Sequence, residues 1–145
     1  SAFSLTKQVA FFQNFPTYTF EIFHQDCTNR SRIKNITIFP LCDSFKDSLM
    51  SSSGYISNAG FESSAQALYL QKPLLCIPIR NQYEQYCNGV ALKQMGVMVV
   101  SRLNKQQVQW WLENRTPLPK IETANTAKVA KTIINKLYSA NKTVD

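Results

Sequence analysis

A turn of small residues at 57–60 (SNAG), between a β-branched segment and a helical pattern, could hold a phosphate. Ser63 and Ser64 follow in the first turn of the expected helix. Small side chains let a ligand approach the backbone, while the free N–H groups and the dipole of a helix start favour negative charge. The same residues are also typical of an ordinary capped turn, so this motif alone leaves both interpretations open.

A second group of polar side chains follows the next apolar segment. It comprises Arg80, Asn81, Gln82, Glu84, Gln85 and Asn88, which can hydrogen-bond planar or hydroxylated ligands. A carboxylate beside an amide can hold two neighbouring sugar hydroxyls, although such a loop can also be plain polar surface. Each group follows an expected strand, and one expected helix lies between the two strands along the chain. A phosphate site and a hydroxyl-binding site would therefore be neighbours, as a nucleotide sugar requires.

Strand and helix patterns alternate along the whole chain and would position these groups. β-Branched, aromatic or continuous apolar segments predict strands at 17–23, 36–39, 54–57, 74–77 and 97–100, with a polar loop over 25–34. Helical patterns cover 4–13, 44–50, 60–70, 82–95, 104–113 and 124–139. We expect Asp43 and Asn104 to cap helix starts, Gly96 to end a helix, and Pro73 to break one.

This alternation predicts a Rossmann-like α/β fold, a doubly wound parallel sheet with helices on both faces. Crossovers should be right-handed, and ligands should bind at the carboxyl ends of the strands. With 145 residues, the prediction is a single domain spanning 1–145. Because the chain starts with a helix and without Met, we interpret it as a fragment that lacks a preceding domain and its own first strand.

Residues 58–89 resemble the donor-binding signature of GT-B glycosyltransferases. The shared pattern is a small residue and Gly, then Ser/Thr, an apolar strand ending in Pro, and an acidic residue with Gln followed by Asn. It is most similar to the bacterial lipid-linked N-acetylglucosaminyltransferase type, and more distantly to plant secondary-product glycosyltransferases. The close match covers about 35 residues, in a strand and helix order that fits nearly the whole chain.

The resemblance implies a role for each matched position. Residues expected at the donor diphosphate are Ala59, Gly60, Ser63 and Ser64, with Asn58 beside them. Glu84 and Gln85 match the pair that contacts donor sugar hydroxyls, and Arg80, Asn81 and Asn88 are further candidates. Leu41 or Cys42 falls near the position whose backbone meets the uracil base.

Two positions depart from the family pattern. Gln66 stands where the family usually has Glu, the carboxylate that accepts hydrogen bonds from both ribose hydroxyls. An amide has one acceptor oxygen and should hold a diol less tightly, which puts UDP affinity in doubt. Gln71 replaces the usual Gly before Lys72-Pro73, and we interpret this replacement as a surface change.

Sugar transfer needs a base that deprotonates the acceptor and a positive or dipolar group that stabilises the departing diphosphate. The expected helix start, with Arg80, could supply the second. No convincing base is present: His24, the single histidine, has no carboxylate motif nearby. No DxD-type motif occurs, and the four cysteines form no C-x-x-C pair, so we expect neither a metal nor a cofactor.

Composition narrows the class of protein and its partners. The chain is 44% hydrophobic and 17% charged, which excludes disorder, and no apolar segment is long enough to span a bilayer. Its net charge of +7 is concentrated in 101–145, with eight basic and three acidic residues. Such a tail favours an anionic membrane or acidic partner, or is a solvated helix face. Without interleaved aromatics, nucleic acid is not expected.

Together these observations predict the UDP-sugar-binding half of an inverting, metal-independent glycosyltransferase, inactive by itself. The acceptor domain and base would lie on a missing N-terminal domain or on a partner chain. Isolated buried thiols suggest a cytoplasmic protein, with the basic tail approaching the inner membrane face through a lipid-linked acceptor. A nucleotide-sugar hydrolase of the same fold, or a non-catalytic binding module, are the alternatives.

Overall fold

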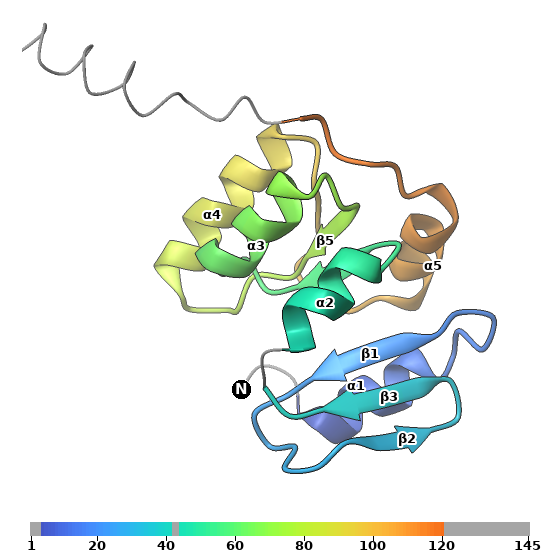
Figure 1. Cartoon of the computed structure of the whole chain (residues 1–145). Helices are drawn as coiled ribbons and strands as arrows, with labels where there is room; N and C mark the ends of the chain where they lie inside the picture. Colours follow the sequence, from blue (N-terminus) through green and yellow to red (C-terminus); the bar gives the residue numbers. More distant parts are fainter. Residues whose placement is uncertain (1–3, 42–43, 121–145) are drawn as a thin grey trace, which may run out of the picture.

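The computed structural model describes residues 4–41 and 44–120, in which helices and strands alternate (Figure 1). The elements are α1 Leu5–Phe12, β1 Phe20–Phe23, β2 Ser31–Ile33, β3 Ile36–Phe39, α2 Ser44–Ser51, β4 Tyr55–Ser57, α3 Phe61–Tyr69, β5 Leu74–Cys76, α4 Tyr83–Gln94, β6 Met98–Val99 and α5 Lys105–Asn114. The Rossmann-like α/β prediction is confirmed. Asp43 and the helix expected at 124–139 lie outside the described residues.

The strands form two three-stranded sheets. Sheet A has the order β1-β3-β2, and sheet B has the order β4-β5-β6. All pairs in sheet B are parallel, as is the β1–β3 pair, whose register places Phe20 opposite Ile36. Helices α3 and α4 connect the parallel strands of sheet B, as a doubly wound fold requires, whereas β2 rather than a helix lies between β1 and β3 along the chain.

The loop expected at 25–34 was a wrong prediction over its second half. Residues 31–33 form β2, which pairs antiparallel with β3. All three residues are exposed, so no buried alternation marks them as a strand. The reversal takes place at Lys34, whose φ of 53° is left-handed, and at Asn35. The Asn35 side-chain amide ties the hairpin to the segment after α1, donating to the Tyr18 carbonyl at 2.9 Å.

The structure largely confirms the predicted helix boundaries, and local interactions explain several of them. Asn104 caps α5, since its Oδ1 accepts the Gln107 N–H at 3.1 Å. Gly96 follows α4 with φ of 85°, which suits a helix-terminating glycine. Gln71 is exposed, but it also has a left-handed φ of 55°. Glycine adopts this backbone conformation without strain, so the Gly that the family usually has at this position serves the backbone geometry. The interpretation of Gln71 as only a surface change missed this role.

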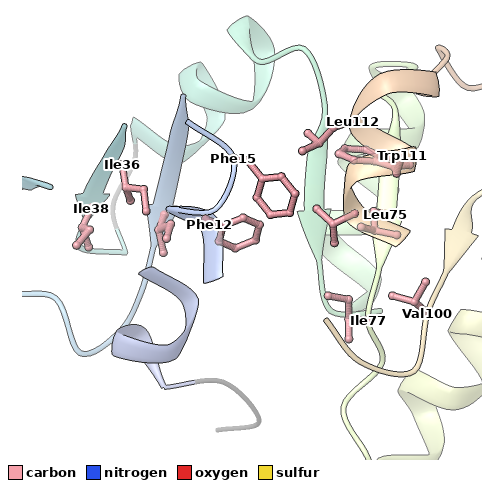
Figure 2. Close-up of a cluster of buried hydrophobic side chains, with 11 residues drawn as sticks. Phe12, Phe15, Ile36, Ile38, Leu75, Ile77, Val100, Trp111 and Leu112 are labelled. Atoms are coloured by element: carbon pink, nitrogen blue, oxygen red, sulfur yellow. The ribbon is translucent and has the colours of Figure 1, made fainter. Parts of the chain in front are cut away.

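The core has two parts, one on each face of the sheets. On the face of α1 and α5, one cluster joins both sheets and includes Phe12, Phe15, Ile22, Leu75 and Trp111 (Figure 2). A smaller cluster on the opposite face contains Leu74 and Cys76 beneath α3 and α4. Alternate residues of β5 thus enter opposite clusters, which explains why this strand is a continuous apolar segment.

None of the helices in residues 4–41 and 44–120 is long and apolar enough to cross a bilayer.

Candidate functional site

The turn between β4 and α3 exposes unpaired backbone amides. Gly60 is the N-cap residue, with extended φ and ψ of −67° and 141°, and no side chain caps the helix. The Asn58 side-chain oxygen accepts the Gly60 N–H at 3.2 Å, which fixes the turn. Among the described residues, the N–H groups of Phe61, Glu62 and Ser63 have no partner. Three donors at a helix start favour an anion.

The two serines of this helix start lie on different sides of it. Ser63 Oγ is 3.4 Å from Ser57 Oγ, so both hydroxyls lie at the turn. Ser64 is buried, and its Oγ lies 4.0 Å from Cys76 Sγ, beneath the helix. Of the serines expected at a diphosphate, the structure therefore places Ser63 beside the free amides and turns Ser64 toward the sheet.

Helix α4 connects the turn with the loop after β5. The Gln85 side-chain carbonyl accepts the Ile79 N–H at 2.9 Å, and Gln85 is itself only 9% exposed. One turn further along α4, Asn88 Nδ2 donates to the Ala59 carbonyl at 3.0 Å. The structure thus brings the two polar groups of the sequence together, at the carboxyl ends of β4 and β5. These linking bonds were not foreseen, because hydrogen bonds between distant segments leave no local pattern.

The other predicted site residues surround this junction less closely. Glu84, Arg80 and Asn81 are exposed, and Asn81 has a left-handed φ of 64°. Gln66 is half-buried in the middle of α3. Leu41 is exposed in the segment that follows β3, and Cys42 lies outside the described residues.

Two cavities flank the junction without containing its turn. One, of about 590 Å³, lies on the other side of α4 and is lined by Arg80, Tyr83, Tyr86, Gly89, Lys93 and Val99 among others. The larger, of about 830 Å³, lies at the amino ends of the strands near Lys72 and Arg115. Both of these cations donate to backbone carbonyls at the end of α2, at Ser52 and Ser53 respectively. The cations of the larger cavity therefore bind the protein's own backbone, which is a structural role rather than a ligand-binding one.

His24 lies at the carboxyl end of β1 and is only 7% exposed. Its Nδ1 accepts the Asp26 N–H at 3.1 Å and is 3.6 Å from the Asp26 carboxylate. The expectation that His24 has no nearby carboxylate was therefore wrong. Because Nδ1 accepts this N–H, the backbone bond of a tight turn two residues long, and not the carboxylate, orients the ring.

Parallel strands with helices on both faces, and with an uncapped helix start at their carboxyl edge, define a Rossmann-like α/β domain. Residues 5–117 match the family model described as glycosyl transferase family 1, and the chain belongs to this family. The predicted glycosyltransferase class is thus confirmed, while the narrower lipid-linked N-acetylglucosaminyltransferase type stays a prediction. No curated protein and no solved structure matches the chain.

The buried thiol beneath the turn predicts a pH dependence of stability. Burial raises the pKa of Cys76 from 9.0 to about 11, an effect that the hydrogen bond with Ser64 partly offsets. The unfolded chain loses this proton at lower pH than the folded chain. The free energy of unfolding should therefore fall as the pH rises from about 9 to about 11.

Urea denaturation across this pH range would measure the effect. Cys76→Ala should show a shallower fall than the wild type, whereas Cys27→Ala, which removes a half-buried thiol far from this turn, should keep the wild-type slope. Equal slopes for all three proteins would contradict the prediction.

Proposed function

We propose that this glycosyltransferase domain binds a nucleotide sugar, with UDP as the nucleotide, as the donor half of an inverting and metal-independent enzyme. The observation that carries the proposal is the bond between Asn88 Nδ2 and the Ala59 carbonyl. It holds the free amides of α3 next to the helix start that bears Glu84 and Gln85. An anion site and a hydroxyl-binding site therefore adjoin, and a diphosphate-linked hexose needs both.

Each group has a chemical task in this proposal. The amides of Phe61, Glu62 and Ser63 would bind the diphosphate and stabilise its charge as the sugar departs, a role that needs no metal. Glu84 would accept hydrogen bonds from sugar hydroxyls, and Gln85 would keep the adjoining loop in place through Ile79. Gln66 would face the ribose, and the loop at Leu41 and Cys42 would lie near the base.

The remaining parts of the reaction would come from elsewhere. An inverting transfer needs a general base at the acceptor hydroxyl, and we assign none to the described residues. We propose that an acceptor domain, on the same polypeptide or on a partner chain, supplies it. A lipid-linked acceptor would bring the enzyme to the inner face of the membrane, where the positive charge of 101–145 would be attracted.

Isothermal titration calorimetry of the 145-residue chain tests donor binding. We expect heat and saturation with UDP and with UDP-N-acetylglucosamine, and weaker binding of UMP, which lacks the second phosphate. No binding of any of the three at millimolar concentration would overturn the proposal. That result would support a non-catalytic module, the alternative that Gln66 favours because an amide holds a ribose diol less tightly.

Gln66→Glu should tighten UDP binding by about 1–2 kcal/mol, because a carboxylate makes charge-assisted hydrogen bonds to both ribose hydroxyls. Calorimetry of wild type and variant measures the change. Gln106→Glu, which makes the same exchange on the exposed start of α5, is the matched control and should leave the affinity unchanged. An unchanged affinity in Gln66→Glu would remove this residue from the site.

A further inference from the structure

We infer that a groove on the outer side of α4 binds a small amphipathic anion, a molecule with an apolar aromatic or acyl body and one acidic group. This α4 groove is the cavity of about 590 Å³ between α4, the loop that precedes it and the edge strand β6. The proposed donor site lies across α4, where Asn88 contacts Ala59, so the inference does not depend on it. It assigns a ligand class to a surface that the proposed function leaves unused.

The fold leaves the α4 groove open. Among the described strands, β6 pairs only with β5, so no further strand borders the groove. Helix α4 is the outer helix of its layer, and α3 lies on its inner side (Figure 1). At the floor, a Cβ placed on Gly89 would lie 2.9 Å from Pro78 Cγ and 3.6 Å from Val99 Cγ1. Any side chain at this position would therefore crowd the floor of the groove.

One face of α4 presents apolar side chains to the groove. Tyr83, Tyr86 and Val90 line it and are 81%, 65% and 45% exposed. Their spacing of three and four residues places them one above another along the helix. The solvent face of a helix is ordinarily polar, and exposed apolar side chains gathered in a concave site are typical of ligand binding. With Pro78 and Val99 at the floor, the groove offers apolar surface on both sides.

The protein's own groups do not engage the two cations of the groove. Arg80 lies in the loop before α4 and Lys93 in the last turn of α4, and both line the groove. Within residues 4–41 and 44–120, neither makes a hydrogen bond or an ion pair, and no Asp or Glu lines the groove. In the larger cavity, by contrast, Lys72 and Arg115 bind backbone carbonyls. The α4 groove therefore carries positive charge that no neighbouring carboxylate balances, which favours an anion.

These features together define the ligand. An apolar body between the tyrosines and Val99 would remove apolar surface from water, and an aromatic one would also pack on the rings. A carboxylate, sulfonate or phosphate at its end would make charge-assisted hydrogen bonds to Arg80 or Lys93. An inorganic anion would gain only the charge interaction, and a neutral hydrocarbon only the burial. The volume of about 590 Å³ is in the usual range for small-molecule sites, about 300–1,000 Å³.

The first test uses anilinonaphthalene sulfonate, a fluorescent aromatic anion, with the 145-residue chain. We expect saturable binding of one probe molecule per chain, and amide chemical-shift changes in NMR that centre on Val90 and Val99. Phenylnaphthylamine has the same rings without the sulfonate, so it should bind at least about tenfold more weakly. Inorganic sulfate at millimolar concentration should cause no such shifts.

Exposed side chains allow matched variants with little risk to the fold. Arg80→Gln combined with Lys93→Gln removes both charges and should weaken the binding of anilinonaphthalene sulfonate at least about tenfold, while that of phenylnaphthylamine stays unchanged. Tyr86→Ser removes one apolar wall and should weaken the binding of both probes. Lys46→Gln combined with Lys105→Gln removes two exposed charges elsewhere, on α2 and α5, and should change neither affinity.

The outcomes separate this inference from the proposed donor site. Equal binding of the two probes, or an unchanged affinity in the variant that lacks both groove cations, would show apolar adsorption without an anion site and overturn the inference. Shifts centred away from Val90 and Val99, or no binding of the sulfonate, would also overturn it. UDP should not displace the probe, because the two sites lie on opposite sides of α4. Displacement by UDP would place the probe at the donor site and contradict the inference, whereas a failure of UDP to bind would leave the groove unaffected.

Discussion

Trp111→Ala is expected to lower the free energy of unfolding by about 3–5 kcal/mol, the usual range for removing a buried aromatic ring. Trp111 is only 5% exposed and lies in the cluster that joins both sheets (Figure 2). A Cβ placed on Gly54, just before β4, would come within 2.8 Å of the Trp111 Cη2, so the ring packs directly on the backbone there. Without the ring, α5 loses a buried contact with the backbone that leads into sheet B.

The neighbouring residue offers a matched control. Trp110 lies on the same helix but is 58% exposed, so Trp110→Ala should change the free energy of unfolding by no more than about 0.5 kcal/mol. Urea denaturation followed by circular dichroism compares the two variants without relying on tryptophan fluorescence. Domains of this kind are stable by about 5–15 kcal/mol, so Trp111→Ala should shift the midpoint visibly. Equal shifts for both variants would contradict the packing described here.

Hydrophobic patterning predicted the elements that enter the core. The segment 74–77 was identifiable because both of its faces are buried, and Asn104 and Gly96 mark helix ends through their own side-chain and backbone chemistry. The exposed strand β2 could not be found in this way, since pairing with β3 alone stabilises it. The division into two sheets was equally hidden, because strand neighbours are set by contacts far apart in sequence.

The location of the candidate site could be predicted from the sequence, but the hydrogen bonds that its residues make could not. The small turn at 57–60 and the polar loop after β5 were found from residue types, and the structure places them side by side. Amides such as Gln85 and Asn88 can bind a ligand or the protein's own backbone equally well. Their choice depends on where Ile79 and Ala59 lie in the fold, which no local pattern encodes.

Asn88→Asp should have the largest effect on the proposed donor site. The substitution replaces the donating amide with a carboxylate that faces the Ala59 carbonyl, so an attractive contact becomes a repulsive one. It also adds negative charge beside the amides proposed to bind the diphosphate. We expect the free energy of unfolding to fall by about 1–3 kcal/mol and UDP binding to weaken at least about tenfold.

Two further variants separate the contributions of geometry and charge. Asn88→Ala removes the bond without adding charge, so it should weaken binding less than Asn88→Asp, and the difference between them reports the repulsion of the diphosphate. Gln94→Glu adds the same charge to the last turn of α4, away from Ala59, and should leave UDP affinity unchanged. Calorimetry at low and high salt completes the test, because the difference between Asn88→Asp and Asn88→Ala should shrink as salt screens the added charge. If Asn88→Asp bound UDP as tightly as the wild type, α4 would not hold a diphosphate site at the start of α3.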